Sequence, residues 1–303
     1  MSNMSTNFGE NLKNIRTDLE ITQDDLCQKL GIDRSYLSKI ENGKINPTLD
    51  TILKIASALN ISPNDLIVNT LPKIKTVGIL GGLGPDTTAE FYISIIQSFQ
   101  KKKTETRPPI VITSVPLPLK TEKKFILHNK DAGDYLPFLL KEAKRLERSG
   151  VDFIVMPCNS LHIFIEELRS AVKIPVLSII EEFVSFLKEK KIKEIGVIST
   201  AATLHHQLYE KALQKASIKF STPDSLQQAK FGKVIHNLVE GTQTSRDRDE
   251  IMNAIISFAE NNVGTVALAC TDLQLLLPQH PHVKIYDTMQ VFADATVNYM
   301  SNE

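Results

Sequence analysis

Two of the three cysteines occupy similar places in two similar stretches of sequence and could do chemistry together. Cys158 ends the apolar run FIVMPC, Cys270 ends the run VALAC, and polar residues follow each of them. Short apolar runs bounded by turn residues predict buried strands, so each thiol is expected at a strand's carboxyl end, just before a helix. Because ligands of open α/β sheets bind at the carboxyl ends of strands, the two thiols are candidates for one site.

Proton transfer at carbon is the chemistry that such a thiol pair suits. A thiolate can remove a proton from one face of a carbon while a thiol returns a proton to the opposite face, which inverts the configuration. The ordinary cysteine pKa of about 8.5 needs only modest tuning, and a helix N-terminus stabilises a thiolate. Thr271 with Gln274 fits a capping box, and the polar turns could also hold a carboxylate. The alternative is that both cysteines are structural, because a buried cysteine is usually inert.

Strands and helices alternate around these cysteines from residue 76 onward. A weak internal repeat relates VGILGGLGPDTTAEFY (77–92) to IGVISTAATLHHQLYE (195–210), and each copy is followed by a strand that ends in a cysteine. The pattern predicts an α/β racemase-like domain of two pseudo-symmetric parallel-sheet lobes, about 76–190 with the C-terminal helix and about 191–285. The expected strands are 76–80, 110–115, 153–156, 176–179, 195–199, 265–269 and 283–286.

Residues 1–68 are expected to form a separate all-α helix-turn-helix bundle, joined to residues 76–303 by a linker at 69–75. Thr22 with Asp25 fits a capping box, Gly31 breaks the chain, and Asp33 can cap the next helix. Residues 12–60, with the run ITQDDL…GIDRSYLSKIENG, resemble the lambda-repressor/Cro-like (XRE) helix-turn-helix family. This resemblance implies double-stranded DNA as a partner, read by the helix after Gly31 in the major groove.

The same resemblance assigns positions to a DNA interface. It implies that Gln23 orients the preceding helix, that Arg34, Ser35 and Ser38 face base edges, and that Lys39 and Lys44 approach phosphates. The alternative is a small helical bundle without a role in DNA binding. Residues 1–70 hold 7 Lys and Arg against 9 Asp and Glu, a formal charge of −2, so the electrostatic footprint of a DNA-binding protein is faint.

Three motifs of the second part, GGLGPDTTAEFY, PCNSLH and ACTDL, resemble signatures of the aspartate racemase branch of the aspartate/glutamate racemase family. The similarity spans residues 76–300 and implies two α/β lobes, an active site between them, and racemisation without pyridoxal phosphate or metal. Cys158 and Cys270 match the family's catalytic pair. The residues implied for substrate binding are Gly82, Leu83, Gly84, Asn159, Ser160 and Thr271, and the polar neighbours implied to assist protonation are His162 and Asp272.

Several assignments stay open. His162 could instead cap or pack its helix, and Asp272 could be a first-turn acid favoured by the helix dipole. Aspartate-specific members of the family carry an arginine where this chain has Glu122, so a shifted Lys120 or Lys123 could take that role, or the substrate is not aspartate. Lys230 and Lys233 are candidates for the family's lysine in the second lobe.

Composition narrows the classes of protein. No apolar run approaches the roughly 18 residues of a membrane helix, and the first residues lack the apolar stretch of a signal peptide, so a cytoplasmic location without membrane association is expected. Three scattered cysteines argue against a disulfide framework and a zinc site. No cofactor or metal is expected, and the partners are a small amino-acid ligand, DNA and a second copy of the chain.

Three functions are compatible with these observations. The first is a working amino-acid racemase fused to a DNA-binding domain. The second is a transcriptional regulator whose racemase-like domain senses an amino acid without turnover. The third is another cysteine-dependent reaction of small carboxylates, such as isomerisation or decarboxylation.

Overall fold

The computed structural model describes residues 4–67, 74–102, 106–118, 121, 132–276 and 278–301. The chain divides into two compact units, Met1–Lys73 and Ile74–Glu303. Most of the expected linker, residues 69–73, lies outside the described ranges. Within those ranges, no helix is both long and apolar enough to cross a membrane.

The first unit is built from helices whose ends carry the capping residues expected from the sequence. The helices are α1 (Met4–Asp18), α2 (Gln23–Leu30), α3 (Arg34–Glu41), α4 (Leu49–Leu59) and α5 (Pro63–Ile67). Thr22 and Asp25 form a reciprocal capping box at the start of α2. Gly31 ends α2 in the left-handed conformation at φ 67°, which glycine adopts without strain, and Asp33 caps α3. The buried face of this unit includes Leu12, Leu26, Leu37, Ile40, Ile55 and Leu66.

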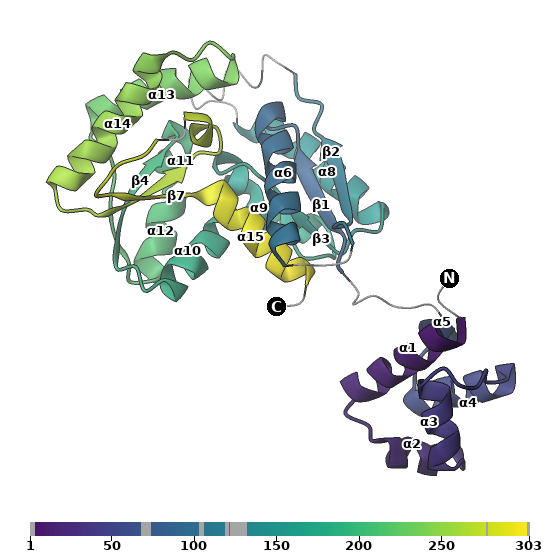
Figure 1. Ribbon diagram of the computed structural model, residues 1–303. Coiled ribbons are helices and arrows are strands. Elements are labelled where there is room, and N and C mark those ends of the chain that lie inside the picture. Colours follow the sequence, from purple (N-terminus) through teal and green to yellow (C-terminus); the bar gives the residue numbers. More distant parts are fainter. Residues whose placement is uncertain are drawn as a thin grey trace. The chain divides into compact units, whose positions relative to one another are not determined.

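Two parallel sheets form the frame of the second unit (Figure 1). The first lobe holds the sheet β2-β1-β3, with β1 (Val77–Gly81), β2 (Ile110–Ser114) and β3 (Phe153–Val155). The second lobe holds the sheet β5-β4-β6-β7, with β4 (Glu194–Ser199), β5 (Lys219–Ser221), β6 (Thr265–Ala269) and β7 (Lys284–Asp287). All described strand pairs are parallel. The predicted class, helices followed by an α/β domain with parallel sheets, is confirmed.

One predicted strand is wrong and one strand was missed. Residues 176–179 do not form a strand, because only Val176 makes an isolated bridge, with Ile154. Ser178 instead caps a helix that begins at Ile179, its hydroxyl accepting a hydrogen bond from the N–H of Glu181. The missed strand is β5, which is three residues long and mostly exposed, so it lacks the apolar run that marks the other strands.

Helices join the two lobes into one unit. Those that matter for the site are α6 (Pro85–Lys101), α8 (Leu136–Arg148), α9 (Ile165–Ala171), α10 (Ile179–Glu189), α11 (Ala201–His205), α12 (Leu208–Lys215), α13 (Ser225–Val239), α14 (Ser245–Glu260) and α15 (Thr288–Met300). Figure 1 shows α15 in the middle of the unit, where it packs against α6 and α10. One apolar core includes Ile79 of β1, Phe183 of α10, Val197 of β4 and Phe292 of α15. A core that contacts both sheets fixes the strand ends of one lobe relative to those of the other.

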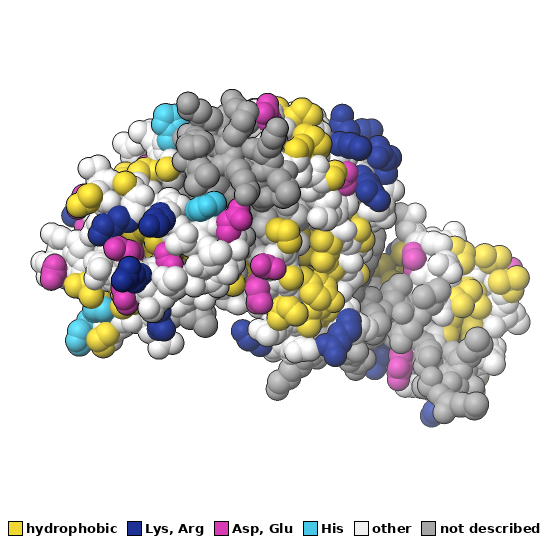
Figure 2. Space-filling model, turned by 90° about the horizontal axis from the view of Figure 1, so that it is seen from above, with side chains coloured by type: hydrophobic (Ala, Val, Ile, Leu, Met, Phe, Trp, Pro, Cys, Tyr) yellow, Lys and Arg dark blue, Asp and Glu magenta, His cyan; other side chains and the backbone are white. Residues whose placement is uncertain are grey.

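The surface of the second unit is mixed in character. Figure 2 shows apolar side chains gathered on one part of the face seen from above, with acidic and basic side chains around them. On α6 the outer face exposes Tyr92 and Ile93, while Phe91 and Ile95 of the same helix are buried. Exposed apolar residues of this kind are common on folded proteins and assign no function by themselves.

Candidate active site

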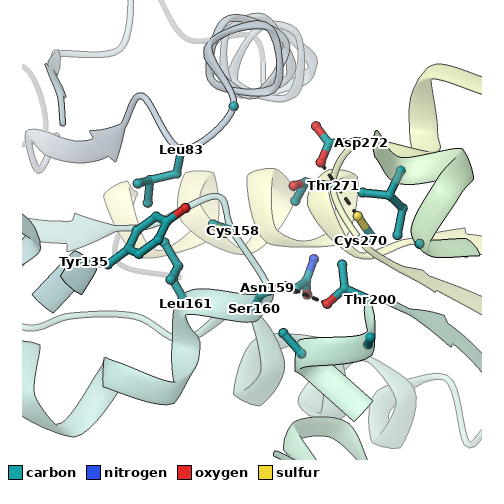
Figure 3. A pocket seen from close by; sticks show the side chains of 15 residues that line it. Leu83, Tyr135, Cys158, Asn159, Ser160, Leu161, Thr200, Cys270, Thr271 and Asp272 are labelled. Atoms are coloured by element: carbon teal, nitrogen blue, oxygen red, sulfur yellow. Dashed lines mark hydrogen bonds between the residues drawn. The ribbon is translucent and has the colours of Figure 1, made fainter. Parts of the chain in front are cut away.

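A pocket of about 80 Å³ lies at the carboxyl ends of the strands, between the two lobes (Figure 3). Both Cys158, which follows β3, and Cys270, which follows β6, line it. Its size suits a small ligand rather than a nucleotide or a peptide. Other residues expected in a substrate site also line the pocket: Leu83, Gly84, Asn159, Ser160, Thr271 and Asp272. Two expected residues, Gly82 and His162, do not line it.

The loop after β1 needs its glycines. Gly82 has φ 80° and Gly84 has φ 104°, conformations that other residues rarely adopt. A Cβ atom on Gly82 would lie 2.6 Å from Ser114 Oγ and 2.7 Å from the backbone nitrogen of Val115. The loop can therefore pass close to β2 and present Leu83 to the pocket, so Gly82 shapes the site without lining it.

His162 hydrogen-bonds the backbone carbonyl of Cys158. It lies in η2, a 3₁₀ helix (Ser160–Phe164), and its Nδ1 is 2.7 Å from the carbonyl oxygen of Cys158. The N–H of Ile179 donates to Nε2 at 3.1 Å, so the proton resides on Nδ1 and is donated to Cys158. Burial lowers the pKa of His162 to about 4, so the ring is neutral. Both ring nitrogens are engaged by backbone, which favours the packing alternative for His162, and its assistance in protonation stays a prediction.

Asn159 joins the two lobes. Tyr209 of α12 donates its hydroxyl hydrogen to Asn159 Oδ1, and Asn159 Nδ2 donates to the Thr288 hydroxyl at 3.3 Å. Thr288 in turn donates to the carbonyl oxygen of Leu268 at 2.9 Å. Oδ1 is thereby fixed as the acceptor, which leaves the second hydrogen of Nδ2 for a ligand in the pocket. Asn159 does not cap a helix with its side chain.

Ser160 makes a second link between the lobes. Its hydroxyl lies 2.8 Å from the Thr200 hydroxyl, which lines the pocket, and 3.2 Å from the Thr203 hydroxyl. Thr200 also caps α11, because its oxygen accepts from the N–H of Thr203. Ser160 and Thr200 line the pocket, and their hydroxyl oxygens form a polar floor that can accept a hydrogen bond from an amine (Figure 3).

Cys270 is a buried thiol beside a buried carboxyl group. Its Sγ donates to Asp272 Oδ2 at 3.7 Å, and Asp272 Oδ1 accepts from Thr87 of α6 at 2.6 Å. Burial, with the charge of Asp272 next, raises the pKa of Cys270 well above its ordinary value, and the N–H groups of Asp272 and Leu273 offset part of this effect. Burial also raises the pKa of Asp272. The expectation that a helix end lowers the pKa of both cysteines is therefore wrong for Cys270.

The turns after both cysteines differ from the expected helix starts. Cys158 is followed by η2, and Cys270 is followed by another 3₁₀ helix, η3 (Leu273–Leu276). The hydrogen bonds of the described residues include no capping box between Thr271 and Gln274, and Gln274 Nε2 donates to Met289 Sδ at 3.2 Å. Short 3₁₀ turns carry weaker aligned dipoles than long α-helices, so burial decides the protonation of Cys270.

Sequence reasoning missed several residues of the site. Thr87 stands inside the GGLGPDTTAEFY motif, and Thr200 has the sequence signal of a helix cap, so both could have been found. Tyr209 reads as a core aromatic in a helical pattern. The remaining residues that line the pocket and were not foreseen are Tyr135, Leu161, Ala201, Ala202, Gly232 and Ile235.

The structure does not bring the candidate lysines of the second lobe into the pocket. Lys230 Nζ pairs with Glu250 Oε2 of α14 at 2.9 Å on the surface, and Lys233 is exposed. The residues of α13 that line the pocket are Gly232, which lies between the two lysines in sequence, and Ile235. Lys120, Glu122 and Lys123 lie outside the described ranges.

In the first unit, the residues expected at DNA lie on or beside α3. Gln23 Nε2 donates to Glu41 Oε2 at 2.6 Å, and its Oε1 is 3.4 Å from Arg34 Nε, so Gln23 links α2 to α3. Glu41 is buried and paired with Arg16 at 2.7 Å. Arg34 also pairs with Asp24 at 3.3 Å, both side chains being largely exposed. Of the other expected contacts, Ser35, Lys39 and Lys44 are exposed and Ser38 is half-buried.

Comparison with known proteins assigns both parts of the chain. Residues 80–296 match the family described as Asp/Glu/Hydantoin racemase, and residues 12–66 match a helix-turn-helix family. The broad specificity amino-acid racemase RacX of Bacillus subtilis (strain 168) is 26% identical over 230 residues, which are 73% of this chain and 96% of RacX. The structure of the Picrophilus torridus aspartate racemase superposes with a TM-score of 0.61 at 25% identity, over 75% of this chain and 94% of that one.

The N-terminal helices have their own relative. The immunity repressor protein of Bacillus phage phi105 is 37% identical over 59 residues, which are 20% of this chain and 41% of the repressor. The match over residues 80–296 covers more than half of the chain. The chain therefore belongs to the Asp/Glu/Hydantoin racemase family and carries a helix-turn-helix domain at its N-terminus.

Proposed function

We propose that the second unit is a cofactor-independent amino-acid racemase in which Cys158 and Cys270 act as acid and base. The observation that carries this proposal is the pocket itself, which is lined by one thiol from each lobe. Inversion at carbon needs an acid and a base on opposite faces of the substrate, and thiols from two lobes can meet this need. The likeness to RacX, named as an amino-acid racemase, agrees with it.

The proposed reaction moves one proton at a time. Cys158, as thiolate, takes the α-proton, and the Cα–H electron pair stays on the substrate as a carbanion conjugated with its carboxyl group. Cys270, held as a thiol by burial, then gives its proton to the opposite face and becomes the thiolate. The second hydrogen of Asn159 Nδ2 is placed to bind the carboxylate, whose charge grows in the carbanion.

The reverse direction requires Cys270 to start as the thiolate. Its nearest described acceptor is Asp272 Oδ2, at 3.7 Å, so Asp272 is the group proposed to receive the thiol proton. The raised pKa of Asp272 makes that transfer less unfavourable than it would be for an ordinary aspartate.

The proposed role of the first unit is DNA binding through α3. It is supported by the helix-turn-helix match and by the resemblance to an immunity repressor. Helix-turn-helix proteins usually bind two half-sites as dimers, so we propose a homodimer with domains at residues 1–68 and 76–303. The formal charge of −2 over residues 1–70 predicts modest and strongly salt-dependent binding by a single copy.

A second candidate function is amino-acid sensing without turnover, which the fused helix-turn-helix domain favours. A ligand that closes the two lobes could change the geometry of a dimer on DNA, provided that it binds the two states with different affinity.

One experiment separates the two functions. The protein is incubated with each common L-amino acid in D₂O, and loss of the α-proton signal is followed by NMR, with Cys158→Ala and Cys270→Ala beside it. Racemase activity predicts α-proton exchange with at least one amino acid. In each cysteine variant this exchange should be lost or confined to one enantiomer. Absence of exchange in a folded sample, together with amino-acid-dependent DNA binding, would establish sensing instead.

A further inference from the structure

Asp272 receives hydrogen bonds from both lobes through its two carboxyl oxygens. Its Oδ2 accepts from the Cys270 thiol at 3.7 Å, within the second lobe (Figure 3). Its Oδ1 accepts from the hydroxyl of Thr87 at 2.6 Å, and Thr87 belongs to the first turn of α6 in the first lobe. Asp272 lines the pocket, whereas the described lining does not include Thr87. Thr87 can therefore act on the pocket through Asp272.

The two hydrogen bonds of the Asp272 carboxyl group differ in strength. A thiol is a weak donor and its bond to Oδ2 is long, so this bond cannot by itself fix the direction of the carboxyl group. A hydroxyl that donates to a carboxylate at 2.6 Å makes a short, charge-assisted hydrogen bond, which is about twice as strong as a neutral one. The bond from Thr87 therefore decides how the carboxyl group is turned, and with it whether Oδ2 faces Cys270 Sγ.

The first turn of α6 is held in place by its own packing. Thr87 is buried, with 1% of its surface exposed. One helical turn further along α6, Phe91 stacks on Phe292 of α15, with ring centroids 5.5 Å apart. The hydroxyl of the neighbouring Thr88 donates to the carbonyl oxygen of Gly84 at 3.0 Å, within the first lobe. The hydroxyl of Thr87 thus reaches the second lobe from a turn whose position the first lobe fixes.

The charge state of Asp272 also depends on Thr87. Burial raises the pKa of Asp272, and the charge of Asp86 acts in the same direction, while the hydrogen bonds from Thr87 and Cys270 lower it. Burial first, and then the charge of Asp272, raise the pKa of Cys270. Thr87 therefore favours the charged form of the carboxyl group, which is the form that can accept a proton.

We infer that Thr87 is a positioning residue of the first lobe, which turns the Asp272 carboxyl group of the second lobe so that Oδ2 faces the Cys270 thiol. This inference rests on the proposed racemase function, in the direction in which Cys270 starts as the thiolate. In that direction the S–H bond of Cys270 breaks, its electron pair stays on sulfur, and the proton passes to Oδ2. The first lobe thereby controls a proton transfer that takes place within the second lobe.

Three substitutions at Thr87 separate orientation from packing. Thr87→Val replaces the hydroxyl by a methyl group and keeps the branched shape, and Thr87→Ala removes the same hydroxyl with a smaller side chain. Thr87→Ser keeps the hydroxyl and should behave like the unaltered protein. Ser98→Ala is the matched control, because Ser98 of the same helix donates a similar hydrogen bond to Asp294 of α15, at 2.5 Å.

The first measurement is α-proton exchange in D₂O from the separate L and D forms of each common amino acid. The enantiomer that depends on Cys270 is the one whose exchange Cys270→Ala removes. Thr87→Val and Thr87→Ala should slow exchange from that enantiomer by about 10-fold or more, because a misplaced catalytic group is costly, and should change exchange from the other enantiomer by less than about 2-fold. Adding Thr87→Val to Asp272→Asn should cause no further loss, because both changes act through the same carboxyl group.

The second measurement does not need turnover. The pH at which iodoacetamide begins to alkylate Cys270 is followed by mass spectrometry of its peptide. A carboxyl group that has turned away from Sγ, or has become neutral, raises the pKa of the thiol less, so alkylation of Cys270 in Thr87→Val should begin at lower pH. Alkylation of Cys158 should keep its pH dependence in Thr87→Val, and alkylation of both cysteines should keep it in Ser98→Ala.

The two measurements distinguish failure of the inference from failure of the racemase function. An unchanged pH dependence of Cys270 alkylation in Thr87→Val, or an equal loss of exchange from both enantiomers, would assign Thr87 to packing alone and overturn the inference. Thr87→Ser that behaves like Thr87→Val would do the same. If the unaltered protein exchanges no amino acid while Cys270 alkylation still shifts in Thr87→Val, the racemase function is overturned and the orientation of Asp272 by Thr87 stands.

Discussion

Cys158 and Cys270 follow corresponding strands of the two lobes, but the protein surrounds them differently. Cys158 is half-buried, and its backbone carbonyl is held by neutral His162. Cys270 is buried beside Asp272, which ties it to Thr87 of the first lobe. The comparison shows that repeated sequence can place two equal groups at corresponding strand ends while their surroundings differ, and burial raises the pKa of Cys270 well above its ordinary value. The proposed racemase mechanism needs one thiol that begins as the base and one that begins as the acid.

The largest expected effect comes from removing either thiol. Cys158→Ser and Cys270→Ser should each lower the racemisation rate by about 10²–10⁴-fold, because a hydroxyl is a much weaker acid than a thiol. The comparison of the two sites predicts that each variant retains slow α-proton exchange from a different enantiomer. NMR in D₂O with separate L and D substrates measures this, and Cys27→Ser in the first unit is the control. Equal loss of exchange from both enantiomers in both variants would contradict opposite roles.

The pH dependence of the unfolding free energy tests the role of His162 beside Cys158. Its pKa is about 4 in the folded protein, against about 6.5 in the unfolded chain, so the unfolded chain binds more protons between these values. The stability contributed by neutral His162 is therefore complete above pH 6.5 and is lost as pH falls toward 4. The loss should reach roughly 3 kcal/mol of unfolding free energy near pH 4.

Urea unfolding at pH values from 4.5 to 7 measures this dependence. His162→Gln should be less stable at pH 7 and should have a flatter dependence on pH, while exposed His282→Gln should follow the unaltered protein. An unchanged slope in His162→Gln would show that another group titrates and that the ring does not hold the Cys158 turn as described.

The sequence predicted the positions of the two cysteines but not the residues that surround them. The buried apolar runs predicted six of the seven strands and placed both cysteines at strand ends, since burial on both faces leaves a clear pattern. The strand predicted at 176–179 is wrong because Ser178 starts a helix there, and the apolar character of the run does not reveal a helix start. The pKa of Cys270 depends on burial by residues distant in sequence, and the Tyr209 contact with Asn159 joins two lobes. Such properties exist only in three dimensions.

A smaller effect is expected at Tyr209, which lies outside the pocket and positions Asn159. Tyr209→Phe removes the donor to Asn159 Oδ1 and leaves that buried oxygen without this partner, at a cost of about 1–3 kcal/mol in stability. The amide can then rotate, so KM should rise by about 10-fold with a smaller change in kcat. The double variant with Asn159→Ala should be no worse than Asn159→Ala alone, because both act through the same amide. Additive effects would show that Tyr209 does not act through Asn159.

The smallest structural change, and the sharpest test of the difference between the surroundings of the two thiols, is Asp272→Asn. The amide keeps an oxygen for Thr87 and removes the negative charge that, together with burial, raises the pKa of Cys270. The pKa of Cys270 should therefore fall, and its alkylation by iodoacetamide should begin at lower pH, while the pH dependence of Cys158 alkylation stays unchanged. Mass spectrometry of the two cysteine peptides separates them, and exposed Asp249→Asn is the control. A fall in α-proton exchange from one enantiomer alone would identify Asp272 as the acceptor of the Cys270 proton, whereas an unchanged alkylation profile of Cys270 would show that burial alone keeps this thiol protonated.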